Sequence, residues 1–215
     1  MFPTKILGYN DCMEISNLPI IVNKRSVNVM FGKYNQSDWE LIRKDIELTK
    51  KSNKIKQRLG LRRVVSSELS EAIYCYITAS LKYRSCSNSK GESMSFDAYN
   101  IKNKQTVQVK STIIKNDCTS FGTSIKEDVI AFLDLEKIFD EKINTQKLSN
   151  KELVKLISLT YIEKKDIKRL LGTVINKGKN ETVADQQSQG RRPRLSIKQF
   201  IKQRGLKSEN ILICK

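Results

Sequence analysis

The stretch SFDAYNIKNKQTVQVKSTI, residues 95–113, decides how we expect this chain to fold. It holds two strand-like runs, 95–100 and 106–115, which are separated by a polar turn at 102–104. Two such runs around a short polar turn predict a β-hairpin. Because the strands of a hairpin lie side by side, polar residues of the two runs are expected to meet.

Three polar residues of this hairpin carry the chemistry that we expect. Gln108 and Lys110 are two residues apart on a strand, so both side chains point to one face, and the first strand can set Asp97 beside them. An aspartate, an amide oxygen and water suit Mg²⁺, which prefers hard oxygen ligands. The lysine would lie within reach of a water that attacks phosphorus, where it can orient that water and stabilise developing charge.

A helix precedes the hairpin. It is expected to begin at Ser66 or Ser67 and to run to about Tyr83, because apolar residues recur at helical spacing. Glu68 and Glu71 in its first turns share one side of the helix. An acid near a helix N-terminus also stabilises the helix dipole, which explains one of the two glutamates without a metal. We therefore expect one of them in the site, with Glu71 the preferred candidate.

The other elements complete an α/β domain, in which helices flank a mixed central sheet. Two capping boxes, Ser37 with Glu40 and Ser149 with Glu152, predict helix starts. The other expected elements are a short strand at 20–22, helices over 37–60, 149–171 and 196–204, and a buried strand over 129–135, with an aperiodic polar stretch over 178–195. We divide the domain into an irregular N-terminal arm (1–35), a core (36–172) and a basic C-terminal segment (173–215).

Composition limits the possible chemistry. The chain has 215 residues, enough for one domain, and it has no histidine, which excludes Ser-His-Asp and Cys-His catalysis. Its five cysteines are widely spaced, so we expect free thiols in a reducing compartment. No apolar run approaches the roughly 18 residues of a membrane span, and the N-terminal sequence does not resemble a secretory signal. A cytoplasmic protein is the expectation.

The charge of the chain favours a nucleic acid as partner. Forty Lys and Arg against 23 Asp and Glu give a net charge of +17, and a basic surface of this kind suits a polyanion. Arginine pairs with guanine in the major groove and glutamine adds amide contacts, although phosphate contacts are equally open, as is a role in solubility alone. The candidate DNA-binding residues are Arg191, Arg192, Arg194, Gln186, Gln187, Gln189, Thr119 and Ser120.

The order of these elements resembles the PD-(D/E)XK nuclease superfamily. The match is a Glu-bearing helix, then a strand with Asp97, then a strand with Gln108-Val109-Lys110. Gln108 stands where the superfamily usually has an acid, and it supplies an oxygen without negative charge. The resemblance implies that Glu71, or else Glu68, offsets the missing carboxylate, and it leaves the number of metal ions open.

A closer resemblance covers about three quarters of the chain. The segments that carry it are SELSEAIYCY (67–76), SFDAYN (95–100), VQVKSTI (107–113), DCTSFG (117–122) and QGRRPRLSI (189–197). They look like the small Type II restriction endonucleases that cut the interrupted palindrome GC/NGC. The resemblance implies a Mg²⁺-dependent homodimer that cuts each strand of DNA after the first GC and leaves a one-base overhang. In-line hydrolysis, the mechanism that we expect, gives 5′-phosphate and 3′-hydroxyl ends. A companion DNA methyltransferase would act on the same site without forming a stable complex.

Two other functions stay open. A repair, junction-resolving or transposon nuclease with the same core would cut by DNA structure rather than by sequence. A DNA-binding protein without catalytic activity would bind through the basic C-terminal segment and cut nothing in Mg²⁺.

Overall fold

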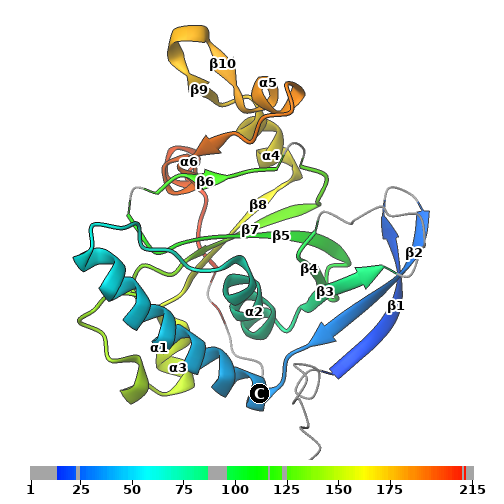
Figure 1. Ribbon diagram of the computed structural model, residues 1–215. Helices are drawn as coiled ribbons and strands as arrows, with labels where there is room; N and C mark the ends of the chain where they lie inside the picture. The colour runs from blue at the N-terminus through cyan, green and yellow to red at the C-terminus, as the bar shows by residue number, and fades with distance from the viewer. Residues whose placement is uncertain are drawn as a thin grey trace, which may run out of the picture.

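A computed structural model describes residues 14–22, 25–86, 96–115, 117–122, 125–209 and 211. At its centre is a mixed seven-stranded sheet with helices on both faces, so the expected α/β class is confirmed (Figure 1). Across the sheet the strands are β1 (Glu14–Val22), β2 (Arg25–Lys33), β3 (Leu81–Cys86), β4 (Ala98–Asn100), β5 (Gln105–Thr112), β7 (Val129–Asp134) and β8 (Ser158–Glu163). All neighbours are antiparallel except β5 and β7, which are parallel.

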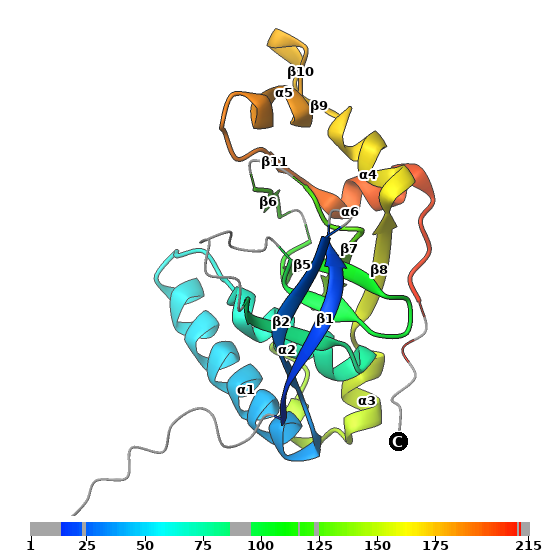
Figure 2. The ribbon, with the colours of Figure 1, turned by 90° about the vertical axis from the view of Figure 1, so that its right-hand side faces the viewer.

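The helices form two layers, one on each face of the sheet. One layer contains α1 (Gln36–Arg58), α2 (Ser67–Thr78) and α3 (Asn150–Lys155). The other contains α4 (Lys164–Leu171) and α6 (Ile197–Arg204), while α5 (Val183–Ser188) lies beyond the end of the sheet (Figures 1 and 2). None of the helices in the described part of the chain has the length and apolar character needed to cross a membrane.

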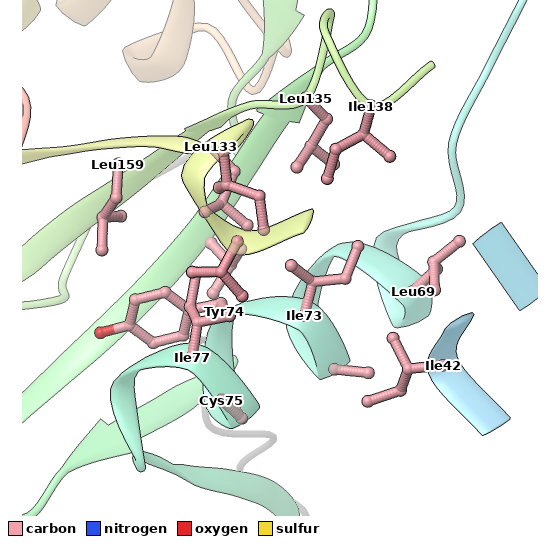
Figure 3. Packing of buried hydrophobic residues seen from close by; sticks show 14 of the residues in the cluster. Ile42, Leu69, Ile73, Tyr74, Cys75, Ile77, Leu133, Leu135, Ile138 and Leu159 are labelled. Atoms are coloured by element: carbon pink, nitrogen blue, oxygen red, sulfur yellow. The ribbon is translucent and has the colours of Figure 1, made fainter. Parts of the chain in front are cut away.

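Strand β7 contributes to the hydrophobic cores on both faces of the sheet. Its Leu133 packs with Ile73 and Ile77 of α2, as Figure 3 shows, whereas Ile130 and Phe132 join the core beneath α4 and α6. Full burial of one such side chain stabilises the fold by about 1.5–3 kcal/mol. The predicted strand buried on both faces is thus confirmed. It pairs with β5 along one edge of that strand.

The N-terminal region contains a long hairpin where an irregular arm was predicted. β1 and β2 pair over their whole length, and the short strand expected at 20–22 is the end of β1. Val29 and Phe31 of β2 are fully buried in a third core. Apolar residues alternate along β2, and this period of two is the signal that the prediction overlooked. Outer strand β1 carries Pro19 opposite Asn28; residues 1–13 of the proposed arm lie outside the described residues.

Both helices before the hairpin differ from prediction at one end. The capping box of α1 joins Asn35 and Asp38 rather than Ser37 and Glu40. α2 begins at Ser67 with Ser66 as its cap, as expected, but it ends at Thr78 because Ala79 adopts a left-handed conformation with φ of 52°. The chain then turns into β3, whose first residues, 81–83, were expected to be the end of the helix.

The helix predicted over 149–171 is wrong in its middle. The capping box of Ser149 and Glu152 does open α3, but that helix ends at Lys155 and is followed by β8 and α4. The run SLTYIE is rich in β-branched and aromatic residues, and it pairs with β7 along six residues. The outer edge of β8 is partly covered, because Glu209 N donates to Leu159 O at 2.8 Å.

The C-terminal segment is more regular than the sequence indicated. β9 (Val174–Asn176), β10 (Glu181–Thr182) and α5 extend beyond the sheet at the top of Figure 1. The two-residue strand β11 (Arg194–Leu195), at the end of the stretch expected to be aperiodic, pairs with β6 (Thr119–Ser120). Helix α6 begins after the cap Ser196 and ends at Arg204, as predicted.

Candidate active site

The candidate site lies where β4 leaves β5. β4 pairs with β5 only from Ala98 opposite Val107 to Asn100 opposite Gln105, whereas β7 follows β5 along six residues. Beyond Val107, the β4 side of β5 is therefore open, and we call this opening the fork. The Asp97 side chain fills it, because its Oδ2 accepts a hydrogen bond from Val109 N at 2.7 Å.

Gln108 and Lys110 lie on one face of β5, as the alternation of the sequence predicted. Val107 and Val109 belong to the core on the α2 face, so the two polar side chains point to the other face. The ammonium of Lys110 lies 6.0 Å from the ring centre of Phe121 and is half-buried. Burial lowers the pKa of Lys110, against the opposing effect of Asp97 and two glutamates. A larger fraction of neutral amine follows at any given pH.

Gln108 has a buried oxygen with no partner. The residue is 8% exposed, and its Oε1 makes no hydrogen bond within the described part of the chain. A buried acceptor without a partner costs about 1–3 kcal/mol of stability, so it calls for a physical explanation. A cation that takes oxygen ligands would provide one.

The structure brings Glu71 to the fork and leaves Glu68 outside. Glu71 forms an ion pair with Lys82 at 3.3 Å, and burial followed by the charge of Asp97 raises its pKa. Burial also raises the pKa of Asp97, against the hydrogen bond from Val109. Glu68 is exposed at the start of α2, where hydrogen bonding to its own backbone N–H lowers its pKa. Glu68 therefore fits the alternative role, that of an acid that stabilises the helix dipole at the N-terminus of α2.

Two residues of the site were missed in the sequence. Lys82 lies opposite Ala98 in the β3–β4 pair, next to Asp97, but β3 was hidden in a predicted helix. Glu127 lies just before β7 and is 4% exposed. No local pattern in the sequence indicates Glu127, which Asp128 separates from β7.

The basic segment contacts the loop that follows β5. Gln187 Nε2 donates to Gly122 O at 2.8 Å, and Phe121 N donates to Pro193 O at 3.0 Å. The charge of Arg192 also lowers the pKa of Lys110. The predicted DNA-binding segment and the fork are therefore neighbours, although 80 residues separate them in the chain.

The candidate DNA-binding residues fall into two groups. Arg191 forms an ion pair with Glu181, and Gln186 and Gln189 donate to the same carboxylate at 2.9 and 3.4 Å. These hydrogen bonds, with the charge of Arg191, lower the pKa of Glu181. Arg192, by contrast, is exposed and has no hydrogen bond or ion pair to another described residue. The same holds for the side chain of Arg194, whose backbone pairs with Ser120.

The oxygens at the fork fit a magnesium ion. Asp97 offers a second carboxylate oxygen, and Gln108 offers its unpartnered Oε1. No three Asp, Glu, Cys or His side chains of the described residues form a metal cluster. An ion here would therefore rest on one or two carboxylates, an amide oxygen and water, which is how Mg²⁺ is usually bound in proteins.

Comparison with known proteins gives one match. The family model described as Bsp6I restriction endonuclease matches residues 34–204. Neither the curated proteins nor the solved structures gave a match. The matched range contains every residue that we place at the fork.

Proposed function

The chain belongs to the Bsp6I restriction endonuclease family, and on that premise we propose that it is a Type II enzyme that cuts double-stranded DNA at a specific sequence in the presence of Mg²⁺. The observation that carries the proposal is the fork, where Asp97 lies beside the strand of Gln108 and Lys110. This order of elements supports a place in the PD-(D/E)XK superfamily.

In the proposed mechanism, Asp97 and Gln108 would hold the ion, and Glu71 would add negative charge from α2. Mg²⁺ bound there would lower the pKa of a water and offset the charge of the phosphate. Lys110, with its lowered pKa, orients the attacking water and accepts or shares its proton. In-line attack on phosphorus breaks the bond to the 3′ oxygen, so the products carry 5′-phosphate and 3′-hydroxyl ends.

The proposed substrate contacts come from the basic segment. Arg192 lies near Lys110, where a phosphate next to the cut would be, and Arg191 is held by Glu181 in a fixed orientation. A fixed guanidinium suits a bidentate contact with guanine, which agrees with the proposed target GC/NGC. The proposed surface is completed by Gln187, Gln189, Arg194 and Ser120.

A palindrome presents two equivalent half-sites, so we propose a homodimer with one active site for each strand. We also propose a companion methyltransferase that protects the same sequence.

The test is cleavage of plasmid and viral DNA by the purified protein in Mg²⁺ or EDTA, with sequencing of the fragment ends. We expect discrete fragments that end at GC/NGC with Mg²⁺ and none with EDTA. Lys110→Ala should abolish cutting and keep DNA binding, while Lys151→Ala on the exposed surface of α3 should cut like the wild type. Binding without cutting in any divalent metal would contradict the proposal and favour a DNA-binding protein, and cutting only at branched DNA would favour a structure-selective nuclease.

A further inference from the structure

Two buried oxygens at the site have no hydrogen-bond partner. They are Oε1 of Gln108 and Oε1 of Glu127, in side chains that are 8% and 4% exposed. The other such atoms among the described residues belong to α1 and to Thr145. A carboxylate oxygen that is buried without a partner costs more than an amide oxygen, because it carries charge. Glu127 therefore needs a positive partner more than Gln108 does.

The position of Glu127 is fixed by its neighbour in the chain. Asp128 Oδ2 accepts hydrogen bonds from Thr106 N at 3.0 Å and from Thr106 Oγ1 at 2.9 Å. Thr106 lies on the same face of β5 as Gln108 and Lys110, so these bonds tie the start of β7 to the start of the catalytic strand. Glu127 itself has one described bond, in which its Oε2 accepts from Lys126 N at 2.9 Å.

The charge of Glu127 acts on both Asp97 and Lys110. It raises the pKa of Asp97 and opposes the lowering of the pKa of Lys110, so its carboxylate lies within electrostatic reach of each. Glu71, a further acid there, already has an ion-pair partner in Lys82 at 3.3 Å. Glu127, like Asp97, is therefore an acid at the fork with no ion-pair partner among the described residues.

We propose that Glu127 is a ligand of a divalent cation that it shares with Asp97 and Gln108. Glu127 then supplies the negative charge that an acid at position 108 would have supplied, and two carboxylates balance the charge of the ion. The inference rests on the proposed function in one respect: it assumes that this ion is the one used for cleavage. It assigns to the ion one side chain from each of three places: the residue before β4, strand β5 and the bend that precedes β7.

The experiment measures cation binding and not cleavage. The full-length protein is titrated with Mn²⁺, with and without duplex DNA, and free Mn²⁺ is followed by electron paramagnetic resonance. Glu127→Gln keeps the shape of the side chain and should weaken Mn²⁺ binding by about tenfold or more. Glu40→Gln makes the same change on the exposed surface of α1 and should stay within about twofold of the wild type. Thermal melts check that both variants are folded.

A second variant moves the carboxylate instead of removing it. Gln108→Glu introduced into Glu127→Gln should recover most of the lost affinity, because it restores a second acid beside Asp97. Wild-type affinity in Glu127→Gln, or a loss that Gln108→Glu does not repair, would overturn the inference. A wild-type protein that binds Mn²⁺ but cuts no DNA would contradict the proposed function and leave the cation site in place, so the two failures are distinguishable.

Discussion

Asp97 Oδ2 accepts a hydrogen bond from Val109 N at 2.7 Å, at the point where β4 no longer pairs with β5. One oxygen of the carboxylate therefore does the work of a missing strand partner, and the other remains for a ligand. The same side chain thus takes the place of a strand partner for β5 and offers an oxygen to the candidate site. This double role explains why a charged group is tolerated in a place that raises its pKa.

Asp97→Asn should stop cleavage and stabilise the protein without its ion. Asparagine can still accept from Val109 N, but it has no charge to desolvate, so the variant gains stability at the expense of activity. We expect the Tm at pH 7 to rise by about 2–4 °C, which corresponds to about 1 kcal/mol for a chain of this size. A lower Tm would show that the hydrogen bond outweighs desolvation.

The gain in stability should depend on pH. Because burial raises the pKa of Asp97 in the folded state, the folded protein binds the proton more tightly than the unfolded chain. The stabilising contribution of Asp97 is complete below its unfolded pKa and is lost as the pH rises through its folded pKa. The Tm difference between Asp97→Asn and the wild type should therefore grow on raising the pH from about 4 to 7, as differential scanning calorimetry would measure.

Lys110 should act partly as a neutral amine. Its pKa is lowered by burial, so single-turnover cleavage is expected to rise with pH below the pKa of an ordinary lysine. Lys110→Arg keeps a cation that cannot lose its proton, and it should be slower by about 100-fold or more at unchanged DNA affinity. Near-normal rates in Lys110→Arg would mean that the positive charge alone is needed.

Lys82 and Glu71 should be coupled in stability. Their side chains are 11% and 17% exposed, so removal of one partner leaves the other charge poorly solvated. Lys82→Met should cost roughly 3 kcal/mol in urea unfolding, and the double variant with Glu71→Gln should recover most of that loss. Strictly additive losses would mean that the ion pair contributes nothing.

Arg192 should contribute to DNA affinity at every sequence. It is exposed and has no partner among the described residues, so Arg192→Ala should reduce the slope of log affinity against log salt by about 0.9. The matched control, Lys151→Ala, lies on α3 at the other end of the molecule from α5, and it should not change the slope (Figure 1).

Arg191 should affect the choice of sequence, and Glu181 should act through it. Glu181→Gln frees the guanidinium that the carboxylate holds, and it should lower the ratio of specific to non-specific affinity as much as Arg191→Ala does. The expected loss is about 1–3 kcal/mol, measured by competition with DNA that lacks the site. A fully additive loss in the double variant would mean that Glu181 does not work through Arg191.

Elements whose pattern is local were predictable from the sequence. The alternation of β5 placed Gln108 and Lys110 on one face, and the apolar run of β7 indicated burial on both faces. The prediction missed β3 and β8 because each strand directly follows a helical pattern. Short apolar runs of this kind fit a helix or a strand equally well. Glu127 could not be foreseen, since its place depends on the parallel register of β5 and β7, a long-range pairing that leaves no local trace.

Both outer strands of the sheet carry features that hinder pairing with a further strand. β1 carries Pro19, which has no N–H to offer a further strand, and residues 208–209 cover part of β8. These features disfavour the merging of two copies into one continuous sheet along these edges. If two copies meet over a palindrome, we expect side-chain surfaces to set the spacing of the two forks, so substitutions there would change the distance between the two nicks.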